Sequence, residues 1–157
     1  MAEKLIPLED AQSIVLSHVA PTNLVEIPVW QAAGFPLAED AVADIDISPF
    51  ANSAMDGYAV RSADLAQASG ETPVTLDVIG HEAAGHVFEG ALGPGETVRI
   101  MTGAPVPEGA DAVVKYEIVE VLDGDGNEGS HVRFSAPAKV GENVRSAAEE
   151  AHACLLY

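Results

Sequence analysis

The chain has little positive charge. Seven lysines and arginines stand against 25 aspartates and glutamates, which gives its 157 residues a formal net charge of −18. The seven cations are scattered singly and form no basic stripe that would neutralise nucleic-acid phosphates, so we expect no nucleic-acid partner. The acidic surface that this balance predicts is also a poor unaided trap for an anionic substrate.

The chain also lacks cysteine pairs and long apolar runs. Cys154 is the single cysteine, which excludes an internal disulfide, and we interpret it as a small apolar residue. No apolar run approaches the ~20 residues that a membrane helix needs. The first ten residues, MAEKLIPLED, carry acids where a signal peptide has a basic region and then a long apolar one. We therefore expect a cytoplasmic protein that is not associated with a membrane.

One amphipathic helix is predicted over residues 8–19, LEDAQSIVLSHV. Its apolar side chains recur at helical spacing along one stripe: Leu8, Ala11, Val15 and Val19. Pro7 suits the start of a helix, the two acids that follow Leu8 complement its N-terminal dipole, and Pro21 stops the run.

The rest of the chain has the pattern of strands and turns. Short apolar or alternating segments occupy residues 24–29, 37–42, 57–61, 74–79, 96–101, 112–122 and 131–134. Fourteen glycines and ten prolines favour a loop-rich β architecture. DGDGN at 123–127 predicts a hairpin turn between two strands, and RSAAEEAHA at 145–153 is a candidate for a second helix.

Two stretches resemble metal sites only superficially. HEAAGH at 81–86 spaces its histidines five apart, whereas a zinc-protease helix needs them four apart, so we interpret both as surface-loop residues. DGDGNEG at 123–129 departs from a calcium loop, because its sixth position is Glu128 and its twelfth is Phe134.

Two further stretches share an unusual design. SPFANSAMDGYAVR at 48–61 and VRIMTGAPVPEGADAVVKYE at 98–117 each place one small polar group, Asp56 or Thr102, at a stiff turn beside a strand. Small neighbours let a ligand approach, and rigid turns hold a polar group in place. The residues alone leave a plainer alternative open, in which Asp56 caps a turn and Thr102 caps a strand end.

These two stretches resemble the two most recognisable motifs of the molybdopterin molybdenumtransferases, the MoeA-type proteins related to the C-terminal part of gephyrin. LAEDAVADIDISPF, GPGETVRIMTG and VGENVR resemble further segments of that family. The resemblance implies an α+β, mainly β fold. It consists of an N-terminal helix region over 1–22, a first lobe from 23–46 and 139–157, and a β-rich lobe over 47–138 inserted into the first.

The resemblance also implies a reaction. Family members are homodimers that insert molybdenum from molybdate into adenylated molybdopterin, with hydrolysis of the adenylate and help from Mg²⁺. Aligned by motif, Asp56 and Thr102 become catalytic residues, with Asp56 also the metal ligand, and Asn52, Ser53 and Arg145 become substrate-binding residues. Asp56 would hold Mg²⁺ or position water, and the Thr102 hydroxyl would donate to phosphate or molybdate oxygen.

The chain departs from the family pattern at three points. SAAEEAHACLLY follows Arg145 where the family has a basic, glycine-containing run, and Phe35 and Pro36 stand where an arginine and an apolar residue are usual. The family's pterin-binding α/β domain is missing from these 157 residues. We therefore expect the chain to be inert alone. The alternative is a non-catalytic dimerisation or scaffold module, and both molybdenum and tungsten stay open as the metal.

Overall fold

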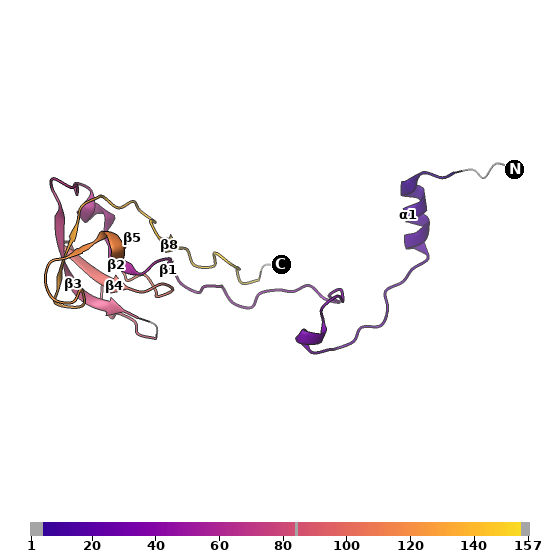
Figure 1. The fold of residues 1–157 in the computed structure, drawn as a ribbon. Helices are drawn as coiled ribbons and strands as arrows, with labels where there is room; N and C mark the ends of the chain where they lie inside the picture. The colour runs from indigo at the N-terminus through magenta and orange to yellow at the C-terminus, as the bar shows by residue number, and fades with distance from the viewer. Residues whose placement is uncertain (1–4, 84, 155–157) are drawn as a thin grey trace. The chain divides into compact units, whose positions relative to one another are not determined.

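The computed structural model describes residues 5–83 and 85–154. The chain divides after Ala41 into an N-terminal unit and a C-terminal unit. Within the described residues, every strand belongs to the C-terminal unit (Figure 1), and no helix is long and apolar enough to cross a membrane. The predicted α+β, mainly β class is confirmed. The boundaries of the two nested lobes stay a prediction.

The N-terminal unit contains the predicted helix. Helix α1 spans Leu8–Ser17, two residues shorter at its end than its apolar stripe suggested. Pro7 precedes it, and the Pro7 carbonyl accepts the first helical hydrogen bond from the Ala11 N–H at 3.0 Å. At the other end the Ser17 hydroxyl donates to the Ile14 carbonyl at 2.8 Å, which satisfies one of the orphan C-terminal acceptors.

Nothing among residues 5–41 is buried. Along the α1 stripe and just beyond it, Leu8, Val15 and Val19 are 69%, 62% and 62% exposed. Neither of the segments 24–29 and 37–42 forms the strand that its composition predicted, and a short 3-10 helix, η1 (Val29–Gln31), is the only other regular element described in this unit. A strand needs a second strand to pair its backbone groups, and this unit supplies none.

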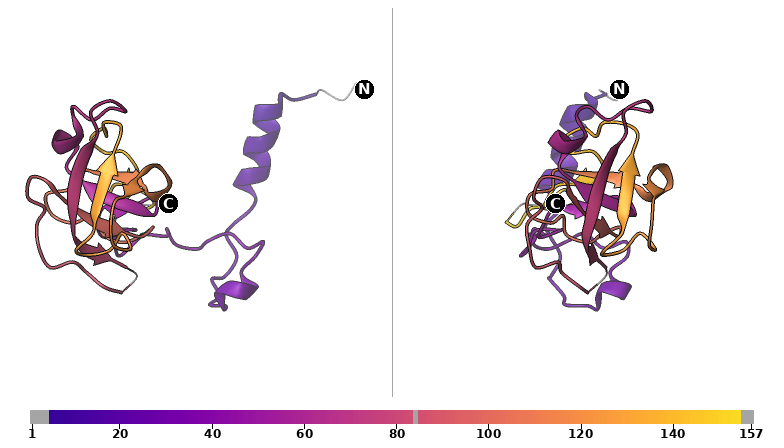
Figure 2. Two further views of the ribbon diagram at one scale, coloured as in Figure 1. Left: turned by 60° about the vertical axis from the view of Figure 1, so that its left-hand side comes forward. Right: turned by 90° about the vertical axis from the view of Figure 1, so that its left-hand side faces the viewer.

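The C-terminal unit is built on one six-stranded sheet, which curls on itself (Figures 1 and 2). Its spatial order is β5–β2–β4–β3–β7–β6. The strands are β2 (Gly57–Val60), β3 (Val74–Glu82), β4 (Glu96–Ile100), β5 (Ala112–Lys115), β6 (Glu120–Val121) and β7 (His131–Phe134). All neighbours are antiparallel except β3 and β4, which are parallel and joined by the long connection that parallel pairing requires.

The core follows the two-residue alternation of β2, which is wholly buried. Tyr58 and Val60 pack on one face among buried side chains of the 3-10 helix η2 (Ser62–Leu65) and neighbouring strands: Leu65, Leu76, Val78, Val132 and Phe134. Ala59 packs on the other face with Ile100, Ala104 and Val113. Both faces of this central strand therefore contribute to the core.

The connection after β3 is anchored by a buried carboxylate. Glu82 is only 1% exposed, and its Oε1 accepts a hydrogen bond from the Phe88 N–H at 2.6 Å. Its Oε2 and the His81 Nε2 are buried and have no hydrogen-bond partner among the described residues. Because β3 extends to Glu82, the interpretation of His81 as a surface-loop residue was wrong, whereas His86 does lie exposed in the loop.

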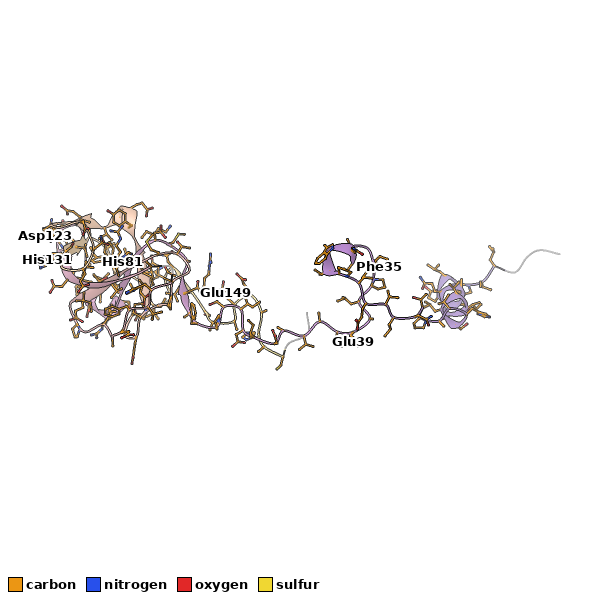
Figure 3. All side chains as sticks on the ribbon, turned by 90° about the horizontal axis from the view of Figure 1, so that it is seen from below. Phe35, Glu39, His81, Asp123, His131 and Glu149 are labelled. Atoms are coloured by element: carbon orange, nitrogen blue, oxygen red, sulfur yellow. The ribbon has the colours of Figure 1, made fainter. Side chains whose placement is uncertain are left out.

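The predicted hairpin at 123–127 is confirmed, since it joins the antiparallel strands β6 and β7. Asp123 Oδ1 accepts a hydrogen bond from the His131 N–H at 2.8 Å, and the two side chains lie together at this hairpin (Figure 3). The segment 112–122, predicted as one apolar run, is instead divided into β5, the 3-10 helix η3 (Tyr116–Ile118) and β6.

The second helix expected at 145–153 does not form. Ala148 has a positive φ of 60°, which an α-helix does not allow. The N–H groups of Ala148 and Glu150 instead donate to the carbonyls of Ser48 and Ile47, at 2.7 and 3.0 Å. Tertiary partners therefore satisfy the backbone of this segment in place of helical hydrogen bonds.

Gly57 offers a test of how β2 fits between its neighbours. A Cβ atom at Gly57 would collide with the Val114 carbonyl of β5. We expect Gly57→Ala to lower the free energy of unfolding by about 1–3 kcal/mol, the usual cost of adding atoms to filled space. Urea unfolding measures this change.

Gly70→Ala is the matched control, because nothing lies within 4 Å of a Cβ there and φ is outside the left-handed region. Its effect should stay within about 0.5 kcal/mol. Equal losses in the two variants would show that β5 does not crowd Gly57.

Candidate functional site

Three motif stretches that are distant in the sequence meet in the C-terminal unit. Strand β1 (Asn52–Ser53) pairs antiparallel with β8 (Val144–Arg145), with Asn52 opposite Arg145. The Ser53 N–H donates to the Ala104 carbonyl at 3.0 Å, and the Gly103 N–H donates back to the Ser53 carbonyl at 2.8 Å. The structure thus joins the turn before Asp56, the turn around Thr102 and the segment that ends at Arg145.

Asp56 and Thr102 are in direct contact. Asp56 Oδ1 accepts two hydrogen bonds from Thr102, one from its N–H at 2.8 Å and one from its hydroxyl at 2.7 Å. The register of β2 and β4 brings them together, because Gly57 lies opposite Ile100 and each polar residue lies just beyond one strand end. Both residues are exposed, so the structure places the two predicted catalytic residues together on one surface.

These hydrogen bonds keep Asp56 ionised. The Thr102 N–H and then the Thr102 hydroxyl lower the pKa of the Asp56 carboxyl below its ordinary value of 3.8. Desolvation opposes these two hydrogen bonds with a smaller effect, and the positive charge of Arg99, the smallest of the four causes, lowers the pKa slightly further. At neutral pH Asp56 is therefore a carboxylate.

The Thr102 turn has no backbone donor left for an anion. The N–H groups of Thr102, Gly103 and Ala104 donate to Asp56 Oδ1, the Ser53 carbonyl and the Met101 carbonyl respectively. The Thr102 hydroxyl gives its hydrogen to Asp56, because an ionised carboxylate only accepts. In this arrangement the hydroxyl has no hydrogen to donate to phosphate or molybdate, and the turn presents only acceptor oxygens.

The three predicted substrate-binding residues lie beside this pair in different environments. Ser53 is fully buried, and its hydroxyl donates to the Met55 carbonyl and accepts from the Met55 N–H, which shapes the turn before Asp56. Asn52 is 7% exposed, whereas Arg145, opposite it, is exposed. Their substrate-binding roles stay predictions.

Sequence reasoning missed Tyr116, which contacts Asp56, and Arg99, which contacts Tyr116. The Tyr116 N–H donates to the Asp56 carbonyl at 3.1 Å, and the Arg99 guanidinium lies over the Tyr116 ring, 4.8 Å from its centroid. In the sequence Arg99 was one scattered cation among seven. The pairing of β4 with β2 places Arg99 opposite Tyr58, with both side chains on the same face of the sheet. The alternation of residues 96–100 in the sequence is the signal that could have indicated this face.

The oxygens at this site fit a magnesium ion only in part. Asp56 Oδ2 accepts no hydrogen bond from any described residue, and Mg²⁺ prefers oxygen ligands. The described part of the chain contains no group of three or more His, Cys, Asp or Glu side chains that could hold a metal. One carboxylate is compatible with Mg²⁺ that is also held by substrate phosphate, which is how this ion is commonly bound.

The helix, the curled sheet and the joined Asp–Thr turns define a mainly β protein of the α+β class. A family model described as the MoeA N-terminal region (domain I and II) matches residues 6–154, so the chain belongs to this family.

Several relatives are molybdopterin molybdenumtransferases. The chain is 45% identical over 115 residues to that of Bacillus subtilis, which covers 73% of this chain and 26% of the relative. It is 38% identical over 147 residues to that of Haemophilus influenzae, which covers 93% of this chain and 34% of the relative. The chain therefore spans about a quarter to a third of the length of these curated relatives.

Solved structures agree with this assignment. A crystal structure of the molybdopterin biosynthesis MoeA protein from Pyrococcus horikoshii OT3 matches with a TM-score of 0.81 at 31% identity, covering 98% of this chain and 39% of that one. A second structure of the Pyrococcus MoeA protein matches with a TM-score of 0.72 at 37% identity, covering 98% of this chain and 38% of that one.

The contact between Thr102 and Asp56 can be tested by titration. We expect Thr102→Val to raise the pKa of the Asp56 carboxyl towards its ordinary value, because the variant keeps the N–H donor and loses the hydroxyl donor. Thr102→Ser keeps both donors and is the control, with a pKa close to that of the wild type. NMR titration of the Asp56 side-chain carbon gives each pKa directly, and an unchanged pKa in Thr102→Val would exclude the hydroxyl contact.

The lowered pKa of Asp56 also determines how the stability of the fold changes with pH. Because the folded-state pKa is lowered, the carboxylate stabilises the fold at pH values above its ordinary pKa, and this contribution is lost as the pH falls through the folded-state pKa. The stability difference between wild type and Thr102→Val should therefore shrink on acidification.

Proposed function

We propose that this chain is the part of a molybdopterin molybdenumtransferase that presents Asp56 to adenylated molybdopterin during insertion of molybdenum from molybdate. The observation that carries the proposal is the ionised Asp56 carboxylate, held by Thr102 where the three motif stretches join. Membership of the MoeA N-terminal family supports the reaction class. A cytoplasmic location is also part of the proposal.

In this proposal Asp56 takes part in the reaction and Thr102 positions Asp56. The unused Oδ2 of Asp56 accepts a proton from the water that attacks the adenylate phosphorus, or serves as a Mg²⁺ ligand. Bound Mg²⁺ would neutralise charge on the substrate phosphate. Thr102 fixes Oδ1 through two hydrogen bonds and so keeps Oδ2 directed at one position.

The donors for the anionic substrates come from elsewhere in the proposed site. Phosphate and molybdate both carry negative charge, and their reaction requires positioned donors or cations. The chain has a net charge of −18, and its Thr102 turn has no free backbone donor. We therefore propose that these residues are inert alone and act together with protein groups that they do not supply.

A chimera tests the proposal. Residues 6–154 replace the matching region of the Haemophilus influenzae relative, and molybdate-dependent hydrolysis of adenylated molybdopterin is assayed. We expect turnover by the chimera and none by the 157-residue chain. Asp56→Asn should lower turnover by about 100-fold or more, the usual contribution of a general base. Thr102→Val should lower it by about 10- to 100-fold, as expected of a residue that orients another.

Asp123→Asn is the matched control, since Asp123 is an exposed carboxylate that also accepts hydrogen bonds in a turn but lies at the β6–β7 hairpin. It should leave turnover unchanged. Omitting Mg²⁺ should abolish turnover of the unmodified chimera. Full turnover by the Asp56→Asn chimera would overturn the catalytic assignment and favour the scaffold module, and turnover by the isolated chain would overturn the claim that it is inert.

A homodimer is also proposed, and the exposed apolar side chains of the N-terminal unit support it. Trp30 and Val29 are 80% and 82% exposed, and a groove of about 700 Å³ lies between residues 21–27 and 32–38. Exposed apolar surface of this extent is typical of interaction sites, and a two-fold dimer is the commonest assembly.

Light scattering tests the dimer. We expect the mass of two chains at micromolar concentration and a shift towards monomer in Val15→Glu, which places a charge on the apolar stripe of α1. Ser13→Glu is the control, because residue 13 lies on the opposite side of the helix from residue 15. A strictly monomeric wild type, or equal effects of the two variants, would contradict the proposed interface.

A further inference from the structure

Asn143 belongs to the third motif stretch, VGENVR at 140–145, and lies beside the Asp56 turn, which we define as residues 53–56. Its backbone has a positive φ of 54°. Glycine adopts this left-handed region freely, and asparagine is among the few other residues that tolerate it. Such a conformation persists where the surrounding contacts hold it. Asn143 has contacts of this kind at its side chain and at its carbonyl.

The side chain of Asn143 binds the edge of the six-stranded sheet. Strand β5 is the last strand on one side of that sheet, so its outer edge has no strand partner among the described residues. The residues before β8 cover this edge instead. The Val113 N–H donates to the Glu142 carbonyl at 2.9 Å, and Asn143 Nδ2 donates to the Val113 carbonyl at 2.8 Å. Asn143 is thereby joined to β5.

The backbone of Asn143 binds the Asp56 turn. Its carbonyl accepts a hydrogen bond from the Ala54 N–H at 2.9 Å. At the next residue of the turn, the Ser53 hydroxyl holds the N–H and the carbonyl of Met55. The contact with Asn143 therefore supports the turn two residues before Asp56, at a point that the Ser53 hydroxyl does not hold.

We propose that Asn143 is a positioning residue for Asp56: its side chain holds the edge of β5, its carbonyl holds Ala54, and its left-handed backbone allows one residue to make both contacts. Asn143 thereby joins the Asp56 turn to the six-stranded sheet along a path separate from the Thr102 hydrogen bonds. It takes no part in the proposed reaction itself. The importance of this positioning for turnover rests on the proposed function, whereas the positioning itself does not.

The experiment measures hydrogen exchange of the Ala54 amide by NMR in the 157-residue chain. Asn143→Gly keeps the tolerance for a positive φ and removes the side-chain donor that ties residue 143 to β5. The Ala54 amide should therefore exchange about 2- to 10-fold faster, the range that the loss of one hydrogen bond usually gives. The Asp77 amide, which donates to the Gly95 carbonyl at 3.0 Å, reports on the sheet and should change less.

Asn127→Gly is the matched control, because Asn127 Nδ2 also donates one hydrogen bond, to Asp125 Oδ2 at 2.8 Å, but lies at the β6–β7 hairpin. It should leave exchange of the Ala54 amide unchanged. In the Haemophilus influenzae chimera, Asn143→Gly should lower kcat by about 10-fold, as expected of a residue that supports another. KM should stay unchanged, since the proposed role of Asn143 includes no contact with substrate.

An Ala54 amide that exchanges at the wild-type rate in folded Asn143→Gly would overturn the proposal, as would an equal acceleration at Asp77 or in Asn127→Gly. If Asn143→Gly does not fold, Asn143→Asp decides by the same criteria, because aspartate also tolerates a positive φ and lacks the donor. Failure of both variants to fold would overturn the proposal, since Asn143 would then be required for the whole fold.

The exchange measurements are independent of turnover. Full kcat in the Asn143→Gly chimera, beside an inactive Asp56→Asn chimera, would overturn the importance of Asn143 for turnover and leave the proposed function intact. Full turnover in the Asp56→Asn chimera would overturn the proposed function and leave the exchange result standing.

Discussion

The two hydrogen bonds from Thr102 to Asp56 Oδ1 are the interaction on which the candidate site depends. They join turns that lie 46 residues apart in the sequence, at the point where β4 ends and its neighbour β2 begins. The strand pairing brings the turns within reach, and the hydrogen bonds then fix one carboxylate oxygen. The other oxygen is left as the acceptor that the turn presents. Burial of Ser53 below the turn and the Tyr116 N–H on the Asp56 carbonyl hold the backbone on which this geometry relies.

The proposed function has to reconcile the strong negative charge of the chain with the anionic substrates that it proposes. Its turns offer acceptors, and Arg99, the cation whose charge acts on Asp56, lies over an aromatic ring and donates to a hairpin carbonyl. An acceptor-only surface complements a metal ion, a water proton or a donor group, and it repels phosphate and molybdate unless another group binds them. The chain covers only about a quarter to a third of the length of its curated relatives, which is compatible with a division of labour between carboxylate and anion-binding groups.

The sequence predicted local features well and long-range ones poorly. Helix α1, the hairpin at 123–127 and the two stiff turns follow from residues close together in the chain, whose preferences act locally. The strands expected at 24–29 and 37–42 did not form, because a strand depends on a partner that composition does not reveal. The helix expected at 145–153 was lost to hydrogen bonds with residues 47 and 48, again a long-range effect. Within the site, motif resemblance pointed to Asp56 and Thr102, but the direction of the Thr102 hydroxyl and the place of Arg99 required the pairing of β2 with β4.

A double-mutant cycle on Asp56 and Thr102 tests the central claim, that these two side chains act as one unit, most directly. Urea unfolding is measured for the wild type, Asp56→Ala, Thr102→Val and the double variant at neutral pH. If the hydroxyl acts through the carboxylate, Thr102→Val should destabilise the wild type clearly more than it destabilises Asp56→Ala. Equal effects in the two backgrounds would show that Thr102 and Asp56 are energetically independent, which would contradict this account of the site.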